Sequence, residues 1–203
     1  MLIYDIEIKK AIQGKNEEVL PEIEYCAGWH DHKNMGVSCV CAYDYEQKRY
    51  RTFFEDNCAE FLALALTHNI LVGFNNIGFD NKVLIAQGWF PDFVNGMPYL
   101  WNQKSYDILQ EIWIGAGLAP EFLYPSHIGY GLDKVVKACG LAAGKTGHGA
   151  IAPIDYQKGN YGSLVDYCLA DVWLTRKLLD LIIETGMVIN PNTGKAISIR
   201  KPF

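Results

Sequence analysis

The chain has 203 residues, of which 50% are hydrophobic and 20% are charged. This length and composition predict one globular domain over residues 1–203 with a sizeable apolar core. Because no apolar run reaches the length of a membrane span and the N-terminus lacks a basic region and a cleavage site, we predict a cytoplasmic protein. The net charge of -5 argues against binding of duplex nucleic acid by bulk positive charge. It does not exclude phosphate binding through metal ions held by carboxylates.

The cysteines are scattered along the sequence and form no CxxC pair. They lie mostly in apolar context, which favours reduced thiols in the core over zinc ligands or a disulfide framework. The six are Cys26, Cys39, Cys41, Cys58, Cys139 and Cys168.

The N-terminal run from Leu2 to Ile8 predicts a strand, because it is rich in Ile, Leu and Tyr. Side chains alternate between the two faces of a strand, so Asp5 and Glu7 project from the same face. Two carboxylates near the middle of a sheet are costly unless a cation neutralises them, and a divalent metal that prefers oxygen ligands would do so. The alternative is an edge strand whose polar face is exposed to water.

Residues 9–35 predict a loop with a short hairpin, including a polar turn over residues 14–18. Residues 36–43 and 49–54 predict two strands that continue from the first strand as an antiparallel meander. A helix follows from Asn57, which we expect to cap it, to about His68.

A buried strand is predicted from Ile70 to Phe74, followed by a turn rich in glycine and asparagine and a helix that starts near Phe79. Asp80 therefore lies in the first turn of that helix. The helix dipole favours a carboxylate there whatever its role, so helix-end electrostatics is a sufficient alternative explanation.

Residues 88–99 predict an ordered loop, residues 105–108 a short strand, and residues 120–131 a segment rich in turns. Residues 132–139 predict a short helix. The segment from Gly140 to Pro153 carries several glycines with Lys145 and His148, which is typical of a mobile loop beside a ligand.

A long helix is predicted from about Tyr161 to Thr185 by its apolar periodicity. Tyr167 and Asp171 are four residues apart and therefore lie on one face of it. Residues 186–203 predict a tail that forms a hairpin around a turn from Asn190 to Gly194.

Together these elements offer four carboxylates and a tyrosine on three separated elements. Two-metal phosphoryl transfer requires this kind of donor set, because acidic side chains hold two cations about 4 Å apart. The three motifs are Tyr4-Asp5-Ile6-Glu7, Gly73-Phe74-Asn75-Asn76-Ile77-Gly78-Phe79-Asp80 and Asp166-Tyr167-Cys168-Leu169-Ala170-Asp171.

In these motifs the chain resembles the DEDD 3'-5' exonucleases of the tyrosine type (DEDDy), and most closely the proofreading exonuclease domain of family B DNA polymerases. The resemblance covers residues 1 to about 185. It implies an RNase H-like α/β fold with a mixed sheet and flanking helices. It also implies that two Mg²⁺ or Mn²⁺ ions are held by Asp5, Glu7, Asp80 and Asp171. Tyr167 would orient the attacking water, and Asn75 and Phe79 would contact the terminal nucleotides of the substrate.

The function implied by this resemblance is hydrolysis at the 3' end of single-stranded DNA or a frayed end, with release of nucleoside 5'-monophosphates. Because no polymerase domain follows residue 203, we expect a free-standing nuclease or a subunit that joins a polymerase or another replication or repair protein. An exoribonuclease and a non-catalytic module that holds nucleic-acid ends for a polymerase or helicase remain alternatives. Retention of all four acids argues against the non-catalytic module.

Two other motifs fit known sites less well. Glu7-Ile8-Lys9 imitates the ExK of restriction-type nucleases, but the partner acid there lies further upstream than Asp5. His30-Asp31 imitates an HD phosphohydrolase, but its segment lacks helical periodicity, which favours a polar surface loop able to approach a substrate.

The remaining charged residues have simple structural explanations. We expect Asp107 and Asp133 to be caps or turn residues and Asp166 to face solvent. Lys134, Lys137, Lys145 and Arg176 are equally consistent with a phosphate patch and with solvated surface charge.

Overall fold

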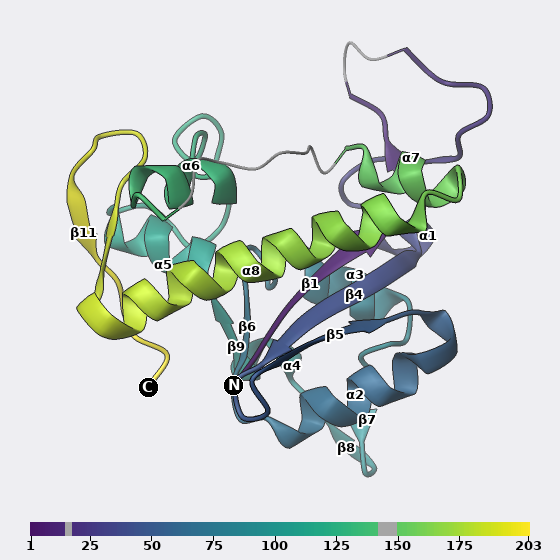
Figure 1. Ribbon diagram of the computed structural model, residues 1–203, viewed down its shortest axis with the longest axis horizontal. Coiled ribbons are helices and arrows are strands. Elements are labelled where there is room, and N and C mark those ends of the chain that lie inside the picture. Colours follow the sequence, from purple (N-terminus) through teal and green to yellow (C-terminus); the bar gives the residue numbers. More distant parts are fainter. Residues whose placement is uncertain (15–17, 142–149) are drawn as a thin grey trace.

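The structure, a computed structural model, describes residues 1–14, 18–141 and 150–203. Its centre is a five-stranded mixed sheet with the strand order β5-β4-β1-β6-β9 (Figure 1). The strands are β1 (Leu2–Ile8), β4 (Val37–Asp44), β5 (Arg49–Phe53), β6 (Leu71–Gly73) and β9 (Ser105–Asp107). β4 is antiparallel to β1 and β5, whereas β6 is parallel to β1 and β9. The predicted mixed α/β fold and its antiparallel meander are therefore confirmed.

Helices cover both faces of this sheet. They are α1 (His32–Met35), α2 (Cys58–Thr67), α3 (Asp80–Ala86), α4 (Trp101–Lys104), α5 (Ile108–Gly115), α6 (Leu132–Ala138), α7 (Ala152–Gln157) and α8 (Tyr161–Thr185), with a short 3-10 turn at Glu55–Asn57. The long helix α8 crosses the sheet and packs against β1 and β4 (Figure 1). It ends where predicted, because Gly186 adopts the left-handed conformation that closes a helix C-terminus.

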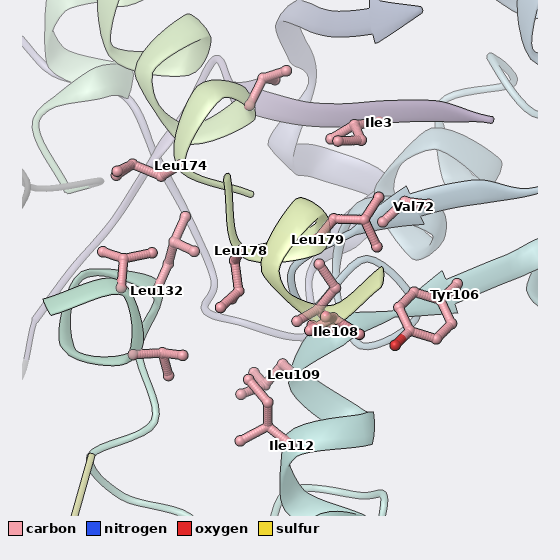
Figure 2. Packing of buried hydrophobic residues seen from close by; sticks show 14 of the residues in the cluster. Ile3, Val72, Tyr106, Ile108, Leu109, Ile112, Leu132, Leu174, Leu178 and Leu179 are labelled. Atoms are coloured by element: carbon pink, nitrogen blue, oxygen red, sulfur yellow. The ribbon is translucent and has the colours of Figure 1, made fainter. Parts of the chain in front are cut away.

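The first hydrophobic layer lies between the sheet and α8. Ile3 of β1 and Val72 of β6 belong to the same cluster as Leu178 and Leu179 of α8 and Ile108 of α5 (Figure 2). The apolar residues of α8 recur at helical spacing, so one face of the helix is buried along its length. This layer fixes α8 over the face of β1 that carries Ile3.

The second layer covers the opposite face of the sheet. Leu2 and Tyr4 of β1 belong to it, together with Phe61 of α2, Leu84 of α3 and Trp101 of α4. Neighbouring residues of β1 thus belong to different layers, as expected when successive side chains point to opposite faces. The strand is buried on both sides, and it lies between β4 and β6. Hence the alternative of an edge strand with a wet polar face is excluded.

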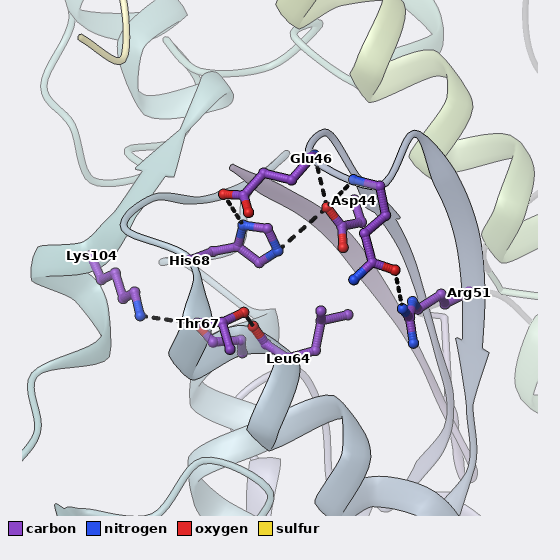
Figure 3. A network of polar contacts seen from close by, with 9 residues as sticks. Asp44, Glu46, Arg51, Leu64, Thr67, His68 and Lys104 are labelled. Atoms are coloured by element: carbon purple, nitrogen blue, oxygen red, sulfur yellow. Dashed lines mark hydrogen bonds and ion pairs between the residues drawn. The ribbon is translucent and has the colours of Figure 1, made fainter.

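A polar network closes one end of the sheet (Figure 3). The buried His68, just after α2, lies with Nε2 3.5 Å from Asp44 Oδ1 and Nδ1 3.3 Å from Glu46 Oε1. Asp44 also accepts hydrogen bonds from the backbone N–H groups of Glu46 and Gln47. These contacts join the β4–β5 turn to the chain that enters β6.

Local predictions near the N-terminus needed two corrections. The hairpin expected within residues 9–35 is wrong, because β2 (Ala11–Ile12) and β3 (Tyr25–Cys26) pair in parallel. Asn57 precedes α2, but its side chain makes no capping bond to that helix. Its Oδ1 instead accepts the backbone N–H of Phe54, which closes the preceding 3-10 turn. Of the predicted polar turn at residues 14–18, residues 15–17 lie outside the described part of the chain.

Further along the chain, residues 88–99 contain an antiparallel hairpin of β7 (Phe93–Val94) and β8 (Met97–Pro98) instead of a plain loop. Asn95 and Gly96 between these strands both have positive φ, as expected for an Asn-Gly hairpin turn. Helix α5 was not predicted. The predicted loop over residues 140–153 includes the start of α7, and Lys145 and His148 lie outside the described residues.

The tail forms the predicted hairpin from β10 (Met187–Ile189) and β11 (Ala196–Ser198). Asn190 stabilises its turn by accepting hydrogen bonds from the backbone N–H groups of Asn192 and Thr193. Throughout the described ranges, every helix is too short or too polar to cross a lipid bilayer.

Candidate active site

A cavity of about 310 Å³ opens where β1, α3 and α8 meet. Seven of the residues that line it were predicted from the sequence as site residues. They are Asp5, Glu7, Asn75, Phe79, Asp80, Tyr167 and Asp171. The fold therefore brings all of the predicted residues to one place, although they come from three distant parts of the sequence.

β1 contributes Asp5 and Glu7 through its alternation. Ile3 of this strand packs in the layer beneath α8, and residues two and four positions further on share its face. Asp5 and Glu7 therefore face α8 from within the sheet, and Glu7 is only 7% exposed. Ile6, the residue between them, belongs to the opposite layer.

Asp80 is the first residue of α3 and is almost completely buried. Its Oδ1 accepts a hydrogen bond of 3.2 Å from the backbone N–H of Ile6, the residue between the two acids of β1. Burial, together with the negative charges of Asp107 and Asp171, raises the pKa of Asp80 to about 7. The carboxyl group is thus held at a site that disfavours its charged form in the absence of a cation.

The turn before Asp80 is tightly folded. Asn75 adopts a left-handed conformation with φ of 72°. A Cβ atom on Gly73 would lie 2.5 Å from Cβ of the buried Asn76, so close approach within the turn requires a glycine there. A Cβ atom on Gly78 would meet the side-chain oxygen of Asn75, which would have to move.

Asp107 holds this turn from outside the cavity. Its carboxylate accepts hydrogen bonds from the backbone N–H groups of Asn75 at 2.9 Å and Ile77 at 3.0 Å. It also caps α5 by accepting from Leu109 and Gln110. The predicted capping role is confirmed, and the same side chain fastens the Asn75 turn to the end of β9.

α8 contributes Tyr167 and Asp171. They lie one turn apart on the face that meets the cavity, and Asp171 is buried whereas Tyr167 is half-buried. Cys168 lies between them, and its thiol contacts the backbone oxygen of Asp5 at 3.5 Å and Asp5 Oδ2 at 3.7 Å. This contact joins α8 directly to β1 beside the cavity.

A buried polar network supports α3 from the layer opposite α8. The hydroxyl of Tyr4 donates to Asn81, and the side-chain amide of Asn81 donates to Asn102 at 2.8 Å and to Ser105 at 3.0 Å. Asn81 follows Asp80 directly, so the network fixes the first turn of α3. Sequence reasoning did not identify this role for Tyr4 and Asn81.

Trp29 is a second residue that sequence reasoning missed. It lines the cavity, is 66% exposed, and packs edge-on against Phe79 with ring centroids 5.9 Å apart. The ring of His32, at the start of α1, lies 6.2 Å from that of Phe79. The segment around His30 and Asp31 therefore reaches the cavity, and the signal available in the sequence was a tryptophan in a polar segment.

Other charged residues lie elsewhere among the described residues. Asp166 is exposed, as predicted. Asp133 is also exposed and lies in the first turn of α6, as predicted. Arg176 lies 4.0 Å from the ring centroid of Tyr43 and pairs with Asp180, away from the cavity lining. Lys134 and Lys137 are exposed on α6 and do not line the cavity either.

The donor set of the cavity fits an oxygen-preferring divalent cation. The ligand atoms offered by its acidic residues are carboxylate oxygens. No lysine or arginine is among the described residues that line it. Ligand atoms of Asp5, Glu7 and Cys168 lie within 4.8 Å of one another. A cation bound there would offset both the mutual repulsion of the acids and the desolvation of Asp80.

We predict that Asp107→Ala lowers the free energy of unfolding by about 2 to 4 kcal/mol, because several backbone N–H groups lose a charged acceptor at once. Asp133→Ala is the matched control, since Asp133 is also an acid in a helix first turn but is exposed. Its loss should cost less than about 1 kcal/mol. Urea denaturation measures both changes, and equal effects of the two substitutions would contradict the assigned role of Asp107.

We also predict that Asp80→Asn stabilises the metal-free protein. Because the pKa of Asp80 rises from 3.8 to about 7 on folding, ionisation of its carboxyl destabilises the fold as the pH rises through this window. The substitution should therefore have little effect near pH 4. Above pH 7 it should raise the free energy of unfolding by about 2 to 4 kcal/mol. Thermal denaturation in EDTA across pH 4 to 8, with the exposed Asp166→Asn as control, tests this, and a variant less stable than wild type at pH 8 would contradict it.

Comparisons with known proteins support the fold. No protein-family model and no curated protein sequence matches the chain. Among solved structures, the chain is similar to the family B DNA polymerase from the hyperthermophilic archaeon Pyrobaculum calidifontis, with a TM-score of 0.58 and 17% sequence identity. The similarity covers 90% of this chain and 24% of the polymerase chain, so the chain spans about a quarter of that protein. At this identity the comparison establishes a shared fold.

Proposed function

We propose that the chain is a divalent-metal-dependent 3'-5' exonuclease that hydrolyses phosphodiester bonds at the 3' end of single-stranded DNA and releases nucleoside 5'-monophosphates. The observation that carries this proposal is the meeting of Asp5, Glu7, Asp80 and Asp171 around one cavity, with Tyr167 beside them. Acids from three elements in one cavity match the donor set of two-metal phosphoryl transfer.

In this proposal Asp5, Glu7, Asp80 and Asp171 hold two Mg²⁺ or Mn²⁺ ions. When bound, such ions acidify a water molecule and neutralise charge that develops on the phosphate. Tyr167 orients the attacking water with its hydroxyl group. A tyrosine phenol ordinarily keeps its proton at neutral pH, so Tyr167 acts by hydrogen bonding and not as the base.

The rest of the cavity suits an unpaired end of a nucleic acid. Asn75 and Phe79 lie on the wall formed by the tight turn before α3, and Trp29 packs against Phe79 at the exposed rim. Aromatic rings can stack on unpaired bases whatever their sequence. The net charge of -5 disfavours binding of a long duplex through its backbone. The similarity in fold to a DNA polymerase also supports a nucleic-acid substrate.

Degradation of labelled nucleic acids tests the proposal. Linear single-stranded DNA labelled at the 5' end should shorten progressively in Mg²⁺ or Mn²⁺, should remain intact in EDTA, and should yield 5'-mononucleotides. Duplex DNA and both forms of RNA are compared in parallel, since an exoribonuclease would prefer RNA. Asp5→Ala and Asp80→Ala should remove the activity without unfolding the protein, whereas Asp166→Ala, an exposed acid on α8, should keep it.

Three outcomes would overturn the proposal. Cutting of a closed circular single strand would indicate an endonuclease. Binding of 3' ends without cleavage under any metal condition would indicate a module that presents ends to a polymerase or helicase partner. Wild-type turnover in Asp5→Ala or Asp80→Ala would exclude the assigned metal ligands.

The two functional residues of α8 should behave differently. We predict that Tyr167→Phe slows turnover by roughly 10- to 1,000-fold, as expected when one positioning hydrogen bond is lost. Asp171→Asn should lose much more activity, because it removes both charge and geometry from the metal site, and added Mn²⁺ should restore it only in part. Single-turnover rates from pH 6 to 9 provide the measurement. If Tyr167→Phe were as inactive as Asp171→Asn and had lost its pH dependence, Tyr167 would be the base.

A further inference from the structure

Three of the six cysteines converge at one point in the fold. The sulfur atoms of Cys39, Cys41 and Cys168 all lie within 4.8 Å of one another, and all three residues are fully buried. The thiol of Cys41 also lies 3.6 Å from the hydroxyl oxygen of Thr52, and that of Cys168 lies 3.5 Å from the backbone oxygen of Asp5. This cluster, which we call the thiol triad, comes from two elements that are far apart in the sequence.

The fold brings the triad together by the same rules that place the carboxylates. Cys39 and Cys41 are two residues apart on β4, so both side chains point to one face of the sheet. That face is covered by α8, which carries Cys168. All three belong to the layer between the sheet and α8.

Carboxylates adjoin the triad directly. In the antiparallel pairing of β1 with β4, Asp5 lies opposite Cys41 and Glu7 lies opposite Cys39. Ligand atoms of Asp5, Glu7 and Cys168 lie within 4.8 Å of one another, so Cys168 belongs to both groups. Because Asp5 and Glu7 also line the cavity, the triad lies immediately behind the wall of that cavity.

We propose that Cys39, Cys41 and Cys168 form a binding site for a thiophilic divalent cation such as Zn²⁺ or Cd²⁺, with a carboxylate oxygen from Asp5 or Glu7 as the fourth ligand. Three sulfurs and one oxygen complete a tetrahedron, the usual arrangement around zinc. Zn–S bonds of about 2.3 Å place sulfur atoms about 3.8 Å apart in a tetrahedron. The three sulfur atoms already lie within 4.8 Å of one another, so closing the site requires each pair to approach by about 1 Å at most. Binding replaces S–H bonds by S–metal bonds and releases the protons to solvent.

The proposed metal site at the thiol triad, which we call the soft-metal site, shares ligands with the cavity. This sharing has a functional consequence. A thiophilic cation that takes a carboxylate from Asp5 or Glu7 removes that ligand from the set proposed for Mg²⁺ or Mn²⁺. Occupancy of the triad should therefore inhibit the nuclease. This consequence rests on the proposed function, whereas metal binding by the thiols does not.

Titration of the reduced, metal-free protein with Co²⁺, a spectroscopic substitute for Zn²⁺, tests the binding site. We expect one ion per chain, thiolate-to-cobalt charge-transfer absorption, and displacement of Co²⁺ by Zn²⁺. Loss of a residue that hydrogen-bonds to a metal ligand costs about 10- to 100-fold in metal affinity. Loss of a ligand itself should cost at least as much. Cys41→Ser and Cys168→Ser should therefore weaken binding by about 100-fold or more. Cys58→Ser, a cysteine outside the triad, should leave it unchanged.

X-ray absorption at the zinc edge of the wild-type protein provides a test that needs no variant. Three sulfur neighbours at about 2.3 Å and an oxygen neighbour are expected. Absence of the charge-transfer band, its persistence in Cys41→Ser, or a zinc shell without sulfur would overturn the proposal and leave the thiols as core packing.

Nuclease assays in excess Mg²⁺ test the link between the two sites. One equivalent of Zn²⁺ should remove most of the activity of the wild-type protein and much less of that of Cys41→Ser. Equal inhibition of both would overturn the link. A chain that binds Co²⁺ through the triad but degrades no nucleic acid would refute the proposed function while leaving the soft-metal site in place.

Discussion

The repulsion among carboxylates gathered at one cavity is the constraint on which this structure depends. Asp5, Glu7, Asp80 and Asp171 approach one another because the hydrophobic layers on both sides of the sheet fix β1, α3 and α8. The raised pKa of Asp80 reflects this conflict, since burial and neighbouring acids both disfavour its charge. The backbone N–H of Ile6 offsets part of the penalty, and a bound cation would offset more.

Much of this arrangement follows from local rules that can be applied to the sequence. The period of a strand places Asp5 and Glu7 together, and the period of a helix places Tyr167 with Asp171. Asp80 was predicted in a helix first turn, and it is the first residue of α3. Because the apolar neighbours of these residues decide which face is buried, the position of the site could be predicted along with the elements.

The parts that could not be predicted depend on contacts between distant segments. The parallel pairing of β2 with β3 joins two segments that are separated in the sequence, and composition does not specify their relative direction. Trp29 reaches Phe79 only after α1 packs near α3. The cysteines were expected to be core thiols, and the three of the triad are buried, but their meeting across β4 and α8 requires knowledge of how that helix crosses the sheet. By contrast, the Asn95-Gly96 turn carried a local signal that the reading of residues 88–99 as a loop overlooked.

Asp107 shows how the geometry of the site and its electrostatics are coupled. Its ionised carboxylate is the acceptor that holds the Asn75 turn and caps α5, yet the same charge raises the pKa of Asp80. Burial also raises the pKa of Asp107 itself. A neutral residue at this position would lower the pKa of Asp80, but it would remove the hydrogen bonds that hold the turn. A cation in the cavity would also lower the pKa of Asp80 and would leave those hydrogen bonds in place. Ordering of the turn and binding of a cation should therefore reinforce one another, because the hydrogen bonds of the turn favour the charged form of Asp107 and that charge attracts a cation to the cavity.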